Sequence, residues 1–244
     1  MQHVRTLAAI AFLAAASAGT GRACAQETEP PIAHNYTLGV RSQYLAASPR
    51  QDYIAARLAP LEPASDITRS GGMGVAIFAS YRRLHLELEL YYDSKLTTVG
   101  DSTLAEVEPR QGSVAGWLRF AVFEKAFGRP AGTRTLQNQA SVLPGVSLAS
   151  TSARIDGWPR DSMESPRSIL EKTETTWAVG VLVEVLFFRG LGACVDYRYR
   201  FAKMTGATPE AEGIALFPPP AEFDFSGHVI SVGMLYRAPF NLFR

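Results

Sequence analysis

Alternation of apolar and polar side chains over residues 84–96 restricts the fold more than any other feature of this sequence. An extended chain would present two opposite faces here, an apolar one of Leu84, Leu86, Leu88, Leu90 and Tyr92 and a polar one of His85, Glu87, Glu89, Tyr91 and Asp93. An α-helix would mix the two sets around its circumference, whereas a strand separates them. The segment is therefore expected to be a β-strand with one apolar and one charged face.

Seven further segments alternate in the same way and are expected to be strands: 35–46, 72–82, 113–123, 138–150, 175–187, 191–201 and 228–237. Each is roughly ten residues long, close to the about 9–11 residues of a transmembrane strand and longer than the about 5–6 of an average soluble strand. Pro144 interrupts the fourth of these seven and cannot donate to a ladder, so a bulge is expected there.

The connections between these segments alternate between long and short. The second and third strands are joined around Arg82 and Arg83, and the sixth and seventh by Phe188, Arg189 and Gly190. The first, third, fifth and seventh links are long, and the fourth is of intermediate length. Outer-membrane barrels have long outer loops and short periplasmic turns. The sequence thus predicts an all-β, eight-stranded antiparallel transmembrane barrel with both termini in the periplasm.

The polar face of these strands is rich in charge. In an outer-membrane barrel this face lines the lumen, which is only wide enough for side chains when there are eight strands. Buried charges must be paired, so we expect a plugged lumen with an ion-pair network. Its expected members are Arg41, Arg82, Glu87, Glu89, Arg119, Glu184, Asp196, Arg198, Arg200 and Arg237. Aromatic residues near strand ends, Tyr91 among them, suit girdles at the two membrane interfaces.

Residues 1–25 are expected to be a cleaved signal peptide. Arg5 precedes an apolar stretch over 7–18, and Ala23, Cys24 and Ala25 provide a cleavage site of small residues. Residues 26–33 would then form a periplasmic segment, and 34–244 the barrel. Cleavage removes two of the 24 basic residues and none of the 23 acidic ones, leaving a net charge of −1. This balance argues against a nucleic-acid partner.

Two segments resemble a known family. These are Val195–Phe201 (V-D-Y-R-Y-R-F) and Gly227–Arg237 (G-H-V-I-S-V-G-M-L-Y-R). Together with the signal peptide and eight strands, they are similar to small outer-membrane β-barrels of the opacity and OmpA-like porin family. The resemblance covers roughly residues 34–240. It implies a protein of the bacterial outer membrane, in contact with lipids and lipopolysaccharide, inserted by the barrel-assembly machinery, and without shared catalytic residues.

The motifs of known chemistry are absent from the sequence: no H-E-x-x-H, G-x-S-x-G or Walker-type loop occurs. We expect no metal and no cofactor, and a non-enzymatic structural or surface-interaction role with an extracellular ligand at the loops. One alternative is a lipid A-modifying hydrolase using Ser226 and His228, with Glu222 or Asp224 as the acid. A second alternative is a soluble periplasmic barrel that binds a small apolar ligand.

Overall fold

The computed structural model describes residues 36–50, 56, 69–94, 97–98, 104–127, 138–159, 167–188, 190–209 and 221–239. The expected signal peptide and the segment 26–33 lie outside the described residues. Eight strands form the barrel: β1 (Tyr36–Pro49), β2 (Ser70–Tyr81), β3 (Leu84–Ser94), β5 (Leu104–Phe120), β7 (Gln139–Pro159), β8 (Arg167–Phe188), β9 (Leu191–Phe201) and β12 (Gly227–Pro239). Four short strands extend it: β4 (Thr97–Thr98), β6 (Phe123–Ala126), β10 (Lys203–Pro209) and β11 (Ala221–Asp224).

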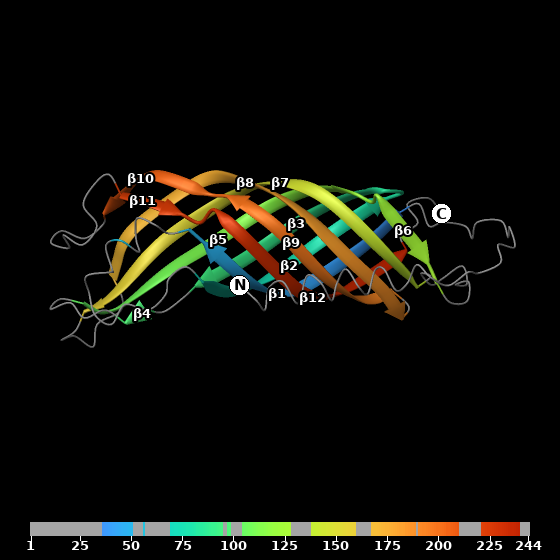
Figure 1. Ribbon diagram of the computed structural model, residues 1–244, viewed down its shortest axis with the longest axis horizontal. Coiled ribbons are helices and arrows are strands. Elements are labelled where there is room, and N and C mark those ends of the chain that lie inside the picture. Colours follow the sequence, from blue (N-terminus) through green and yellow to red (C-terminus); the bar gives the residue numbers. More distant parts are fainter. Residues whose placement is uncertain are drawn as a thin grey trace, which may run out of the picture. The chain divides into compact units, whose positions relative to one another are not determined.

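The eight strands close on themselves. Each pairs antiparallel with its neighbours in the order β1, β2, β3, β5, β7, β8, β9, β12, and β12 returns to β1 from Gly227 opposite Pro49 to Pro239 opposite Thr37 (Figure 1). Closure leaves no unpaired edge among these strands. The expected eight-stranded antiparallel barrel is confirmed. Within the described ranges, no helix is long and apolar enough to cross a membrane.

The tight turns between β2 and β3 and between β8 and β9 lie at the same end of the barrel. The start of β1 and the end of β12 lie at this end too. Tyr36 lies opposite Tyr81, and Thr37 lies opposite Pro239. Gly190, in the turn between β8 and β9, has a φ of 91°, and a Cβ there would lie 1.9 Å from the Arg237 carbonyl oxygen. Only glycine fits this turn without strain.

Arg82 corrects one expected member of the lumen network. It occupies the turn between β2 and β3 with a φ of 52°, and its side chain is exposed, over the Tyr81 ring. The strand ends at Tyr81, so the alternation that would have turned Arg82 inward no longer applies.

Three strands are much longer than expected. β5, β7 and β8 contain 17, 21 and 22 residues, so much of the long links expected over 97–112 and 151–174 is strand. The reason is that the outward residues of these extensions are hydroxylated or charged. Ser152 on β7 and Thr173 on β8 continue the pleat without continuing the apolar alternation. The rest of these links, and the link over 128–137, lie outside the described residues.

Pro144 disturbs the sheet, but not as a bulge in its pairing with β8. That register runs unbroken from Leu143 opposite Leu182 to Gly145 opposite Gly180. The irregularity is on the other side of β7, where residues 120–122 pass opposite only Leu143 and Pro144 before β6 resumes the pairing. Proline offers no N–H on that side, which accounts for the break.

Candidate functional site: the lumen of the barrel

The two faces of each strand have opposite environments. On β3, Leu88 is 48% exposed, whereas the neighbouring Glu89 is 0% exposed. The same contrast separates exposed Val181 from buried Leu182 on β8. On β3 the acidic side chains therefore point into the barrel and the leucines point out of it.

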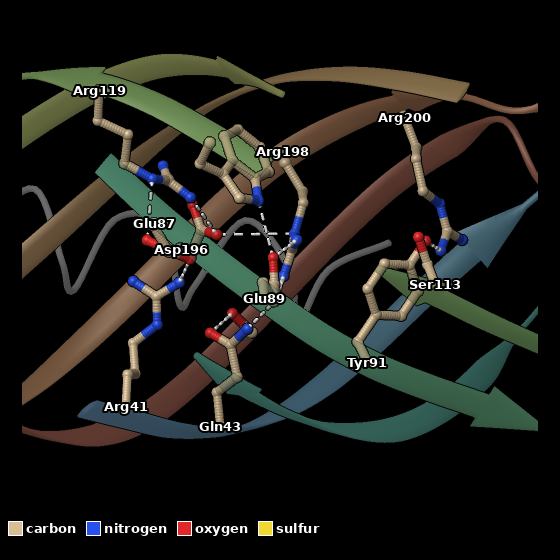
Figure 2. Close-up of polar contacts among 12 residues, drawn as sticks. Arg41, Gln43, Glu87, Glu89, Tyr91, Ser113, Arg119, Asp196, Arg198 and Arg200 are labelled. Atoms are coloured by element: carbon tan, nitrogen blue, oxygen red, sulfur yellow. Dashed lines mark hydrogen bonds and ion pairs between the residues drawn. The ribbon is translucent and has the colours of Figure 1, made fainter. Parts of the chain in front are cut away.

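A chain of ion pairs crosses the lumen between four strands. Arg41 of β1 donates to Glu87 of β3. Arg119 of β5 lies with Nε 3.5 Å from Glu87 Oε2 and donates through Nη1 and Nη2 to the two oxygens of Asp196 at 3.3 and 3.0 Å. Figure 2 shows Arg41 and Arg119 on either side of Glu87. Strands far apart in sequence are thus joined through the interior.

Glu89 is the most fully bonded carboxylate of this network. Arg198 donates two hydrogen bonds to it, of 2.6 and 2.7 Å, and Trp117 Nε1 donates a third at 2.8 Å. Gln43 also donates to Glu89, and its own Oε1 accepts from Ser231 at 2.9 Å. Paired guanidinium bonds of this geometry are among the strongest in proteins. Glu89 therefore links β1, β3, β5 and β9.

Two further arginines lie toward the ends of the network. Arg237 donates to Glu184 at 2.5 Å near the tight-turn end. Arg200, which Figure 2 shows beside Tyr91 and away from the main group, donates to the Tyr91 hydroxyl at 2.9 Å and lies 3.7 Å from Asp93. Within this network of described residues, five buried arginines match five buried carboxylates: Arg41, Arg119, Arg198, Arg200 and Arg237 against Glu87, Glu89, Asp93, Glu184 and Asp196. A sixth buried carboxylate, Asp156, pairs with Arg110 and Arg154 instead.

The structure brings nine of the ten expected residues into the lumen and leaves out Arg82. Sequence reasoning omitted Asp93, Gln43 and Trp117 from the network, although alternation had already put all three on the polar face. It also assigned Tyr91 to an interfacial girdle, whereas Tyr91 is buried inside the barrel. The alternation of inward and outward positions along each strand, here called strand parity, was the signal that would have found these residues.

Aromatic rings separate the arginines along the lumen. The Arg119 guanidinium carbon lies 4.0 Å from the Trp117 ring centroid, and that of Arg198 lies 5.4 Å from the same centroid. Arg198 and Arg200 lie 5.7 and 5.5 Å from the Tyr91 centroid. Cation–π contacts of this kind add to the attraction when both partners are desolvated. Trp117 thus contacts both Arg119 and Arg198, and Tyr91 contacts both Arg198 and Arg200.

Apolar layers and tight packing fill the remaining space. A cluster near the tight-turn end contains Phe78, Ala121, Leu143, Leu182, Leu186, Cys194 and Leu235. A cavity between the Arg198 and Arg200 levels has a volume of only about 10 Å³. That is room for about one water molecule. The described part of the lumen is a packed core.

We expect the barrel to give no large, stable channels when it is reconstituted in planar bilayers, because side chains fill the lumen from Leu186 to Arg200. Single-channel recording tests this expectation. Sustained conductance of porin size would contradict a plugged interior.

The structure does not assemble Ser226 and His228 into a catalytic pair. The Ser226 hydroxyl accepts a hydrogen bond from the Ala202 N–H at 3.0 Å. His228 Nδ1 lies 2.7 Å from the Tyr197 hydroxyl, and Asp224 accepts from the Ser226 N–H at 2.9 Å. A serine nucleophile needs its base within hydrogen-bond reach. Among the described residues, no hydrogen bond joins Ser226 to His228.

No family model matches the sequence, and no curated protein matches it. Solved structures do match. The chain is similar to OprG, an outer membrane protein of Pseudomonas aeruginosa (TM-score 0.48, 11% identity, 82% of this chain and 95% of that one). It is also similar to Ail, the attachment invasion locus protein of Yersinia pestis (0.47, 9%, 83% and 99%), and to Neisserial surface protein A (0.38, 12%, 84% and 96%). The chain itself is a closed eight-stranded β-barrel.

Proposed function

We propose that this chain is a non-enzymatic β-barrel protein of the bacterial outer membrane, with a structural or surface-interaction role. The observation that carries the proposal is the direction of the two faces: Arg198 and Glu89 are buried, while Leu88 and Val181 are exposed. A soluble protein rarely exposes a continuous apolar surface of this extent. Lipid is the environment in which such a surface is stable.

The height of the apolar surface supports this proposal. On β3 it runs from Leu84 to Tyr92, with Ser94 beyond it. At about 3.4 Å per residue this stretch is about 27 Å long, and a tilt of about 40° reduces its height to about 21 Å. The apolar band of outer-membrane barrels is about 25 Å tall. The polar extensions of β5, β7 and β8 would then project beyond the outer surface.

Export, insertion and partners are further parts of the proposal. The signal peptide over 1–25 would direct the chain across the inner membrane, and the barrel-assembly machinery would insert it. Lipopolysaccharide and other outer-membrane lipids would surround this apolar surface, which we call the apolar belt. Any extracellular ligand would bind the four outer loops, which the strands hold at the end opposite Gly190.

The structure disfavours the soluble alternative. A soluble barrel that binds an apolar ligand needs an apolar interior with free volume. Here the interior centres on ion pairs such as Arg119 with Asp196, packed side chains fill the space around them, and a broad apolar surface lies on the outside.

Fractionation tests the proposed location. We expect the protein to stay with outer membranes after alkaline carbonate extraction, because its apolar belt faces lipid. Without boiling, we also expect the folded barrel to migrate differently on a detergent gel from the heated chain. Release by carbonate together with a single gel mobility would contradict a membrane-spanning barrel.

A further inference from the structure

The short strand β6 has one unpaired edge. It pairs with β7 from Phe123 opposite Val142 to Ala126 opposite Gln139, and among the described residues no strand lies along its other side. All four of its residues are exposed. Figure 1 shows β6 at the tight-turn end of the barrel. An unpaired edge is a template on which another extended chain can form hydrogen bonds.

The pairing with β7 decides which backbone groups of β6 remain free. The Phe127 N–H donates to the Asn138 carbonyl oxygen at 2.9 Å. Hydrogen bonding alternates along an antiparallel strand, so Lys125 also directs its backbone groups to β7. The backbone N–H and C=O groups of Glu124 and Ala126 therefore point to the unpaired side.

The unpaired side of β6 continues the line of β3. The Ala121 N–H donates to the Arg83 carbonyl oxygen at 2.8 Å, one residue before β3 begins at Leu84. There the chain comes out of the turn from β2, so no part of β3 lies beside β6. Antiparallel pairing is slightly more stable per residue than parallel pairing. A strand bound antiparallel to β6 would be collinear with β3, and its C-terminal end would meet the turn between β2 and β3.

That turn carries two exposed arginines, Arg82 and Arg83. The Arg82 guanidinium carbon lies 5.3 Å from the centroid of the Tyr81 ring. In the described part of the chain, neither arginine has an acidic side chain within salt-bridge distance. Arginine binds carboxylates through charge-assisted hydrogen bonds that are about twice as strong as neutral ones. The charge of the turn is therefore complementary to the C-terminal carboxylate of a chain.

We propose that the edge of β6 binds the extended C-terminal tail of a periplasmic protein. The tail adds a strand to β6, its backbone bonds Glu124 and Ala126, and its terminal carboxylate accepts hydrogen bonds from the two arginines of the turn. The periplasmic source of the partner rests on the proposed function, which places the tight-turn end on that side of the membrane. In this mode of recognition the main-chain hydrogen bonds supply the affinity.

A short synthetic peptide of alternating valine and threonine, with a fluorescent label at its N-terminus and a free C-terminal carboxylate, is the probe. Fluorescence anisotropy with the folded barrel in detergent micelles measures its binding, and this result does not depend on where the protein lies in the cell. We expect saturable binding with a Kd below about 1 mM. A peptide that ends in an amide should bind roughly tenfold more weakly, because the arginines then lose their ionic partner.

Two variants separate the backbone edge from the charge. A126P removes one N–H on the unpaired side without removing a bond to β7, and proline is tolerated at such edge positions. It should abolish binding while the gel mobility of the folded barrel is kept. R83Q should weaken binding of the free-carboxylate peptide roughly tenfold. R50Q, which changes an exposed arginine beyond the other end of β1, is the control and should bind the peptide as the native protein does.

Three results would overturn the proposal. One is the absence of saturable binding, and the second is equal binding of the free-carboxylate and amidated peptides. The third is unchanged binding by A126P. Any of these would leave the fractionation result unaffected, so failure of the peptide site is distinguishable from failure of the proposed membrane location.

Discussion

Replacing Arg198 with methionine is expected to lower the free energy of unfolding of the barrel by about 3–5 kcal/mol. Arg198 supplies two of the hydrogen bonds to Glu89 and lies 3.6 Å from Asp196. Its removal leaves a buried carboxylate with less compensation, and such a charge is far more costly than a lost surface contact. Denaturant titration of the refolded protein in detergent, followed by tryptophan fluorescence, measures the change.

Two controls separate this effect from loss of any arginine. Arg154, whose side chain is 44% exposed, shares buried Asp156 with Arg110, so R154M leaves that carboxylate one partner and should cost less than about 1 kcal/mol. The double variant E89L/R198M should recover part of the stability, because it removes both buried charges together. Equal losses in R198M and R154M would contradict a buried network that holds the barrel together.

Placing a charge on the outer face of β3 is the second change with a large expected effect. L88R puts an arginine at the middle of the apolar belt, midway between Leu84 and Tyr92. In a bilayer this should cost about 2–4 kcal/mol, because the guanidinium cannot be hydrated at that depth. Reversible unfolding from phospholipid vesicles gives the free energy directly.

The matched control is S152R, which adds the same side chain to the outer face of β7 at the edge of the apolar surface, since Ser152 pairs with Gly112 and Gly112 pairs with Tyr92. Its expected cost is about 0–1 kcal/mol, since arginine near the interface reaches water. The difference between the two variants reports depth in the membrane. Similar small costs at both positions would mean that water surrounds the belt.

Strand parity predicted the interior well wherever the outer face was apolar. On β3 the alternation of leucine with Glu87 and Glu89 fixed both faces, because lipid and lumen demand opposite residue types. Parity carried no such signal where the outward residues are polar, as at Ser152 and Thr173, so the extensions of the long strands were taken for loops. At Arg82 the strand had already ended, and a turn conformation decided the direction of the side chain.

The pairing within the lumen could not be predicted from the sequence. Arg198 and Glu89 are 109 residues apart, and which acid each arginine meets depends on the register of all the intervening strands. Restricting the expected network to charged residues also excluded Gln43 and Trp117, although neutral donors can satisfy a carboxylate equally well. Pro144 shows a similar limit, because the sequence indicates a break but not the side of β7 that bears it.

The most direct test of the account is a spin-label scan along β8, from Ala178 to Val183, in lipid vesicles. With Cys194 replaced by alanine, single cysteines labelled at each position report contact with oxygen dissolved in lipid. A barrel with its apolar face in lipid should give a period of two, with high oxygen access at Val179 and Val181 and low access at Ala178 and Leu182. The opposite phase, or access only to a water-soluble nickel complex at Val179 and Val181, would contradict a barrel whose apolar face meets lipid.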